Sequence, residues 1–139
     1  MEFKSIILDS SVIISYFWPQ DSNHENARRL FQYLDVYQNI FITNLITLEI
    51  ATVLSQRIGK SKLKVVTNDF VNSLDNLFVN EQDTGKVLSQ FLEIKDKNIS
   101  FIDLSTSYIA KKHKIDTVLT FDKHFKRLGK DYGFNVLGC

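Results

Sequence analysis

The stretch Ser5-Ile6-Ile7-Leu8-Asp9 decides the fold class, because a short, continuous apolar run ends there at a carboxylate. Apolar residues without polar alternation, several of them β-branched, are typical of a strand that is covered on both faces. Such strands belong to parallel sheets flanked by helices. Runs of similar character follow at residues 40–43, 77–79, 117–120 and 134–137, which we expect to be further strands of one sheet.

Helical periodicity fills the segments between these runs. Residues 23–37 carry apolar side chains at i, i+3, i+4 and i+7, which predicts an amphipathic helix. Residues 45–58 predict a second helix, with Gly59 as its stop. Further helices are expected at 65–74, 84–94 and 105–114. Strands that alternate with helices predict an α/β protein with a central parallel sheet.

Composition supports one ordinary domain over residues 1–139. The chain is 44% hydrophobic and 24% charged, which excludes a disordered protein. Its single cysteine, Cys139, excludes a disulfide framework and favours the reducing cytoplasm. Asp9 interrupts the first apolar run before signal-peptide length, and no run approaches the roughly 20 residues that span a membrane. We therefore expect a cytoplasmic protein without membrane contact.

Two acidic residues lie at or just past the ends of predicted strands. Asp9 ends the first strand, and Asp122 comes two residues after Thr120, where the fourth strand ends. In a parallel sheet the carboxyl ends of the strands share one edge, and ligands bind there. The sequence therefore predicts that both carboxylates lie at the same edge.

Two more carboxylates interrupt apolar patterns. Glu49 falls on the face of its predicted helix that also carries Leu45 and Val53, where an uncompensated charge is costly. Asp103 follows Ile102 and precedes a predicted helix. Each acid also has a simpler interpretation. Asp9, Asp103 and Asp122 could cap helices, and Glu49 could face solvent. Their joint occurrence at these places favours a common site.

Four converging carboxylates would repel one another unless a cation is bound. The histidines His24, His113 and His124 are too dispersed for a zinc motif. Oxygen ligands alone suit the hard ions Mg²⁺ and Mn²⁺, which commonly act on phosphate esters. The residues therefore predict a metal-dependent site for phosphoryl or phosphodiester chemistry.

Four segments resemble PIN-domain ribonucleases, and specifically the small VapC-type toxins. They are residues 6–14 with Asp9 and Ser11, residues 45–54 with Glu49, residues 100–110 with Asp103, and residues 118–125, where Thr120-Phe121-Asp122 ends a strand and Phe125 follows. The order and spacing are family-like over essentially the whole chain. The pattern departs from the family at Leu104-Ser105, where members often carry alanine.

The resemblance implies a three-layer α/β/α sandwich around a parallel sheet of four or five strands. It implies that Asp9, Glu49, Asp103 and Asp122 bind Mg²⁺ or Mn²⁺ for hydrolysis of an RNA phosphodiester. Ser11 and Thr120 would be the hydroxyls that orient these carboxylates. It further implies a small antitoxin protein as partner and a homodimer.

Other functions fit less well. A haloacid-dehalogenase-like phosphatase needs a second aspartate two positions after the first, and Ser11 occupies that place. A receiver domain needs an acidic pair near its first strand. A catalytically inactive PIN-like module that binds RNA or protein stays open as the alternative, although such a module has no electrostatic reason to keep four acids.

The net charge of +1 hides an uneven distribution. Residues 111–130 hold seven Lys/Arg against two Asp, a local charge of +5, so the rest of the chain carries −4. A basic segment beside an acidic metal site suits RNA, although a solvated lysine face is the simpler explanation. Residues 57–64 form a smaller basic cluster. Tyr16-Phe17-Trp18 favours core packing or a protein interface over base stacking, and His124 favours a surface imidazole.

Overall fold

The computed structural model describes residues 4–139, so residues 1–3 of the expected domain lie outside the described part. Five strands form one sheet: β1 (Ser5–Leu8), β2 (Asn39–Thr43), β3 (Asp75–Leu77), β4 (Thr117–Leu119) and β5 (Asn135–Leu137). Their order is β3-β2-β1-β4-β5, and all neighbouring pairs are parallel. The predicted α/β class and the parallel sheet are confirmed.

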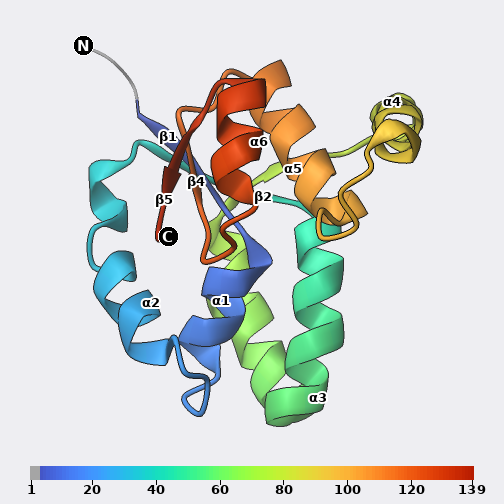
Figure 1. Ribbon diagram of the computed structural model, residues 1–139. Helices are drawn as coiled ribbons and strands as arrows, with labels where there is room; N and C mark the ends of the chain where they lie inside the picture. The colour runs from blue at the N-terminus through green and yellow to red at the C-terminus, as the bar shows by residue number, and fades with distance from the viewer. Residues whose placement is uncertain (1–3) are drawn as a thin grey trace.

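Six α-helices connect the strands: α1 (Ser10–Phe17), α2 (His24–Phe31), α3 (Asn44–Asp69), α4 (Glu81–Glu93), α5 (Phe101–Lys112) and α6 (Phe125–Tyr132). Helix α1 packs against α2 and α3, whereas α5 packs between α4 and α6 (Figure 1). Because crossover connections are right-handed, and the chain reverses direction along the sheet after β3, these two groups cover opposite faces. The architecture is a three-layer α/β/α sandwich.

The middle strand β1 lies in the core. The side chains of Ile6, Ile7 and Leu8 have no solvent exposure, as a strand covered by helices on both faces requires. Burying an aliphatic side chain of this size contributes about 1.5–3 kcal/mol to folding. The apolar run that opens the chain is therefore the most deeply buried strand, and it holds the following residue in a fixed place.

Aromatic side chains pack between α1, α2 and the end of α3. The ring of Tyr16 stacks on Phe31 at 4.3 Å between centroids, and Phe70 lies between Phe17 and Phe31 at 5.1 and 5.8 Å. The guanidinium of Arg57 lies 4.7 Å above the Trp18 ring. The aromatic run at the C-terminal end of α1 is therefore engaged in packing within the chain.

The helix predicted over residues 23–37 is shorter than expected. Helix α2 ends at Phe31, and a separate 3₁₀ turn covers Leu34–Val36. Leu34 is buried all the same, so the apolar spacing correctly identified an inward-facing residue. A single 3₁₀ turn can point one side chain inward as an α-helix does, and periodicity does not distinguish the two.

The strand predicted at residues 77–79 is also displaced. Strand β3 covers Asp75–Leu77, and Phe78 is 68% exposed beyond its end. The reason is Asn44, whose side-chain amide accepts from the Val79 N–H at 2.7 Å and donates to the Val79 carbonyl at 3.3 Å. This pair of bonds turns the chain away from the sheet and toward α4.

Gly59 interrupts the long helix α3, as predicted, but the helix resumes immediately. Its φ of 82° lies in the left-handed region, where a residue with a Cβ is strained. The second helical portion, residues 60–69, therefore starts earlier than the predicted helix at 65–74. Among residues 4–139, no helix combines the length and the apolar character that a membrane crossing needs.

Candidate functional site

The order of the strands changes direction at β1: β2 and β3 lie on one side of it, and β4 and β5 lie on the other. Strand β1 pairs with β2 on one side and with β4 on the other, with Leu8 opposite Leu119. The N–H of Asp9 donates to the Leu119 carbonyl at 2.9 Å, which carries the pairing one residue further. Asp9 and Thr120 thus lie side by side at the carboxyl edge, at the switch point where open α/β sheets bind ligands.

Asp9 occupies the N-cap position of α1, but its side chain makes no capping hydrogen bond of normal N-cap geometry. The residue is only 3% exposed, and no side-chain hydrogen bond reaches the α1 backbone in N-cap geometry. Its Oδ2 instead accepts hydrogen bonds from Ser11 Oγ at 2.8 Å and from Thr120 Oγ1 at 2.7 Å. Burial raises the pKa of the Asp9 carboxyl above its usual value, and these two hydroxyls oppose the rise.

The same two hydroxyls hold the loop between β4 and α6. Ser11 Oγ accepts from the Phe121 N–H at 3.1 Å, and Thr120 Oγ1 accepts from the Asp122 N–H at 3.0 Å. Each hydroxyl therefore donates to Asp9 and accepts from the loop. Asp122 is positioned relative to Asp9 by hydrogen bonds through single side chains.

Glu49 lies on α3, within the second turn after the strand. Thr43 caps this helix, since its Oγ1 accepts from the Ile46 N–H at 3.1 Å, and this fixes where the helix leaves the edge. Glu49 is half-buried. Burial raises the pKa of its carboxyl, the negative charge of Asp9 raises it further, and the Ser10 hydroxyl opposes the rise.

Asp103 caps its helix and faces the other acids at the same time. With Ser100 it forms a capping box: Asp103 N–H donates to Ser100 Oγ at 3.0 Å, and Asp103 Oδ2 accepts from the Ser100 N–H at 3.1 Å. The simpler interpretation, that Asp103 caps a helix, therefore describes part of the role of this residue. Burial is the main cause that raises the pKa of Asp103 to about 6, the Ser100 bonds oppose it, and the charges of Asp9 and Asp122 add to it.

Asp122 precedes α6, which begins at Phe125, so it is not the N-cap of that helix. Its Oδ1 accepts from the backbone N–H of His124 at 2.9 Å and lies 2.6 Å from His124 Nδ1. Sequence reasoning had left His124 outside the site. The i, i+2 spacing of an aspartate and a histidine at a strand end was the available signal.

The charge of Asp9 acts on both Glu49 and Asp103, and that of Asp122 acts on Asp103, so the four predicted acids are electrostatic neighbours. Their carboxylate oxygens do not form a complete set of metal ligands in this structure. Within residues 4–139, no three acidic, histidine or cysteine side chains converge at metal-ligand spacing. The donors are nevertheless the hard carboxylate oxygens that Mg²⁺ and Mn²⁺ prefer, and a cation would relieve the repulsion and the cost of burial. By donor chemistry the residues fit such an ion.

The fold is thus an α/β domain with a parallel sheet, and acidic side chains lie at the carboxyl edge of that sheet, beside its switch point. The family model for the PIN domain matches residues 6–131, which include all four acids. The chain belongs to the PIN-domain family. No curated protein sequence matches it.

Solved structures share this fold. VapC20 of Mycobacterium tuberculosis, described as a toxin that cleaves the sarcin–ricin loop, has a TM-score of 0.79 at 19% identity, over 89% of this chain and 95% of that one. FitAcB of Neisseria gonorrhoeae has a TM-score of 0.67 at 20% identity, over 95% and 96%. VapBC2 of Rickettsia felis, bound to a DNA fragment from its promoter, has a TM-score of 0.63 at 16% identity, over 95% and 96%.

Proposed function

We propose that this chain is a metal-dependent endoribonuclease and the toxin of a toxin–antitoxin pair. The observation that carries the proposal is the group of carboxyls around Asp9: burial raises the pKa of Asp9, Glu49 and Asp103, and the charge of Asp9 adds to the rise at the other two. In the metal-free protein the ionised form of these three carboxyls is penalised, because burial disfavours a charge. A bound cation would remove this penalty by stabilising the ionised carboxylates, and it could in turn bind a phosphate.

Asp9, Glu49, Asp103 and Asp122 are the proposed ligands of Mg²⁺ or Mn²⁺. The bound ion would supply an activated water and would neutralise charge at the scissile phosphodiester. The chain's own contribution is to hold the carboxylates in place. Both hydroxyls that contact Asp9 donate to Oδ2, so Oδ1 is free of these two donors.

Basic side chains are the proposed contacts for the RNA backbone. Lys123, Lys126 and Lys130 are exposed along one side of the β4–α6 loop and α6, and no ion pair with another residue of the described part engages them. Burial raises the pKa of the Cys139 thiol, and the charges of Lys126 and Lys123 oppose the rise, while that thiol lies 3.6 Å from the Asp122 carbonyl. These two lysines therefore lie close to the acidic edge.

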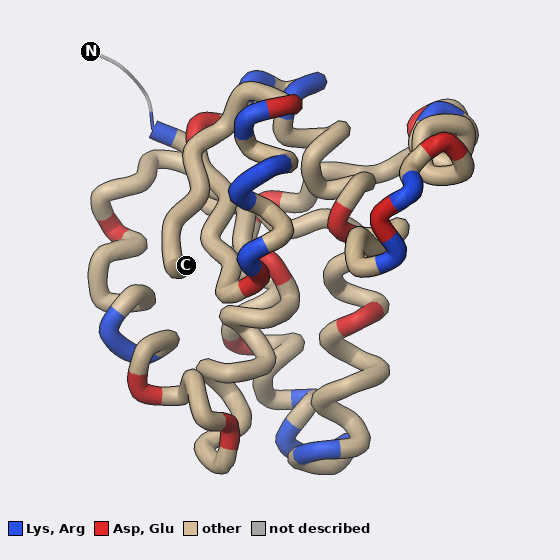
Figure 2. Tube along the Cα trace, in the orientation of Figure 1, with Lys and Arg blue, Asp and Glu red and all other residues tan. Residues whose placement is uncertain are grey.

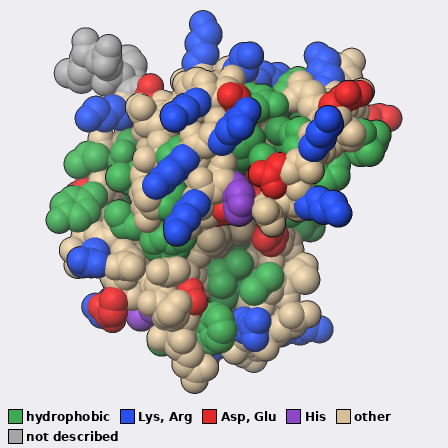
Figure 3. Space-filling model, in the orientation of Figure 1, with side chains coloured by type: hydrophobic (Ala, Val, Ile, Leu, Met, Phe, Trp, Pro, Cys, Tyr) green, Lys and Arg blue, Asp and Glu red, His purple; other side chains and the backbone are tan. Residues whose placement is uncertain are grey.

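The two charge types are adjacent in the folded molecule. Figure 2 shows basic positions of α6 beside acidic positions at the carboxyl edge, and Figure 3 shows basic side chains gathered over the α6 side of this face. A polyanion can therefore be attracted by the lysines while its scissile phosphate approaches the carboxylates.

For partners, we propose a small antitoxin protein, and a second copy of the chain to form a homodimer, both within the cytoplasm. Support comes from the fold neighbours, of which FitAB and VapBC2 are described as bound to DNA fragments, VapBC2 to one from its promoter. Co-expression with the product of the adjacent reading frame, followed by size-exclusion chromatography with light scattering, tests both partners.

The activity is tested by cleavage of a structured RNA pool in Mn²⁺ or Mg²⁺ buffer. Asp9→Asn and Asp103→Asn should each lower the rate more than about 100-fold, because each removes a proposed metal ligand. Asp35→Asn is the matched control, since Asp35 is exposed on the turn after α2. Wild-type cleavage by either site variant would remove that residue from the site.

A thermal titration separates the enzyme from an inactive PIN-like module. A ligand that binds only the folded state raises Tm, so millimolar Mn²⁺ should raise the Tm of the wild type and of Asp35→Asn but not that of Asp103→Asn. No shift in the wild type, together with no cleavage of any RNA tested, would favour a binding module.

A further inference from the structure

A pocket of about 430 Å³ opens beside the acidic edge, between α2 and the ends of β4 and β5. It is lined by Asn26, Arg29, Leu30, Tyr33, Phe121 and Gly138. Its volume falls in the range of about 300–1,000 Å³ that small-ligand sites occupy. None of the residues that line it belongs to the proposed metal site.

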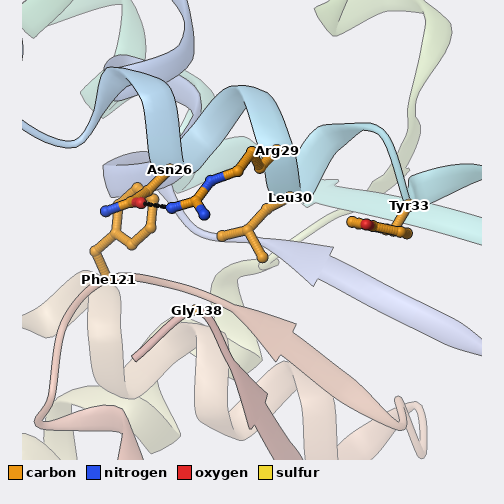
Figure 4. A pocket seen from close by; sticks show the side chains of 6 residues that line it. All are labelled: Asn26, Arg29, Leu30, Tyr33, Phe121 and Gly138. Carbon is orange, nitrogen blue, oxygen red and sulfur yellow. Dashed lines mark hydrogen bonds between the residues drawn. The ribbon is translucent and has the colours of Figure 1, made fainter.

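The pocket residues on α2 share one face of that helix, at i, i+3 and i+4, and Tyr33 lies just after the helix ends. Together they face the ends of β4 and β5. Figure 4 shows the Arg29 guanidinium hydrogen-bonded to the Asn26 side chain at the end of the pocket where Phe121 stands, while Tyr33 lines the opposite end. Gly138 contributes only backbone. The pocket therefore offers two aromatic rings, one aliphatic side chain and a group of N–H donors.

Phe121 connects this pocket to the site. It precedes Asp122 directly, and its N–H donates to Ser11 Oγ, which in turn donates to Asp9. Adjacent Cα atoms are about 3.8 Å apart, so the backbone of the pocket wall at Phe121 lies directly beside that of a proposed metal ligand. A polymer whose phosphate reaches the carboxylates can place its neighbouring unit here.

We propose that this pocket binds an unstacked nucleobase of the RNA, next to the scissile phosphodiester, and so sets sequence preference. The inference rests on the proposed ribonuclease function. Unpaired bases are recognised by stacking on aromatic rings and on Arg guanidinium planes, with hydrogen bonds to their edges. Because no carboxylate of residues 4–139 lines the pocket, its donors favour a base edge rich in acceptors, as guanine presents through O6 and N7.

Cleavage-site mapping on a random-sequence RNA pool tests the proposal. Wild type should show one enriched base beside the cut, and Arg29→Gln should flatten that position alone. Tyr33→Ala should raise KM about 10-fold with little change in kcat, as loss of one stacking partner predicts. Tyr33 is 65% exposed, so this variant keeps the fold even if changes at the partly buried Phe121 do not.

Arg28→Gln is the matched control, because Arg28 is the neighbouring arginine on α2 but pairs with Glu25 and does not line the pocket. It should keep the wild-type preference. An unchanged preference in Arg29→Gln and Tyr33→Ala would overturn the proposal, and so would a loss of affinity for a protein partner with unchanged preference.

A binding assay separates this proposal from the activity. Asp103→Asn protein in EDTA is titrated into single-stranded RNA that carries a 2-aminopurine at one position, and the fluorescence change reports stacking of that base. The change should disappear when Tyr33→Ala or Arg29→Gln is added to Asp103→Asn and persist with Arg28→Gln. A persistent change in all combinations would overturn the pocket. Loss of the change in the Tyr33→Ala and Arg29→Gln combinations, together with no RNA cleavage by the wild type, would overturn the nuclease and leave the pocket standing.

Discussion

Thr120 donates a 2.7 Å hydrogen bond to the carboxylate of Asp9, although 111 residues separate the two in the chain. Both residues follow buried strands that pair in parallel, and the register of those strands places them next to each other. The threonine hydroxyl also accepts from the Asp122 N–H. One side chain therefore fixes the distance between two of the proposed metal ligands.

Thr120→Val should lower cleavage by about 10–100-fold, because a buried Asp9 loses a donor and the Asp122 loop loses its acceptor. The stability loss should be about 1–3 kcal/mol, as expected for a buried polar group left without its partner. Thr117→Val on the same strand is the control, since no hydrogen bond within residues 4–139 uses its hydroxyl. Equal kinetics of the two variants would contradict the role of Thr120.

The metal-free protein should be more stable at pH 5 than at pH 7.5. Burial is the main reason that the folded pKa of Asp103 is about 6 against 3.8 in the unfolded chain, so the folded state holds a proton that the unfolded state releases. This contribution is fully present below about pH 3.8 and is lost as pH rises through about 6. The pKa values of Asp9 and Glu49 are shifted in the same direction.

Asp103→Asn isolates that contribution. In EDTA it should raise stability at pH 7.5 by about 1 kcal/mol, a value discounted for the solvent that reaches this partly buried carboxyl, and it should do little at pH 4. Urea unfolding at both pH values measures the difference. A larger gain at pH 4 than at pH 7.5 would have the wrong sign for a raised pKa.

Gly138→Ala should destabilise the protein by about 1–3 kcal/mol and lower activity as well. Its φ of 109° is strained for any residue with a Cβ, and that atom would collide with the Thr120 carbonyl oxygen. The collision would displace the residue that holds Asp9. Gly85→Ala is the control: Gly85 lies inside α4 with open space around it, so alanine there should stabilise by about 0.5–1 kcal/mol. Thermal unfolding and cleavage rates check both.

The two basic clusters of the sequence should differ in RNA binding. Lys126→Gln with Lys130→Gln should reduce the slope of log K against log salt by about 1.4, since each lysine is expected to neutralise one phosphate of a single strand. Lys60→Gln with Lys62→Gln should leave the slope unchanged. This pair comes just after the interruption at Gly59, and the helical portion before it, residues 44–58, spans about 22 Å from the carboxyl edge. That is well beyond the Debye length of roughly 10 Å at ordinary salt, so the two lysines are screened from the site. An equal loss of slope in the two variants would show that RNA also follows α3.

The sequence by itself determined the class of fold and the places where the acids stand. Apolar runs such as Ile6–Leu8 predict buried parallel strands, because only full burial explains an unbroken run that short. A carboxylate at or just past the end of such a run must lie near the carboxyl edge, so Asp9 and Asp122 could be predicted as edge residues from the sequence. Element boundaries were less certain. The turn at Asn44 and Val79, which ends β3 early, depends on a contact over 35 residues that no local pattern records.

Only the tertiary structure decided how these residues are arranged against one another. The pairing of His124 with Asp122 and the double role of Asp103 as helix cap and repelled neighbour depend on side-chain directions. The pocket between Arg29 and Phe121 depends on how α2 packs across the strand ends. The physical reason is that burial repeats apolar residues along the sequence with the period of the helix or strand, so it can be read from one chain. Hydrogen bonds and charge pairs join residues that are far apart in the sequence, so no local pattern records them.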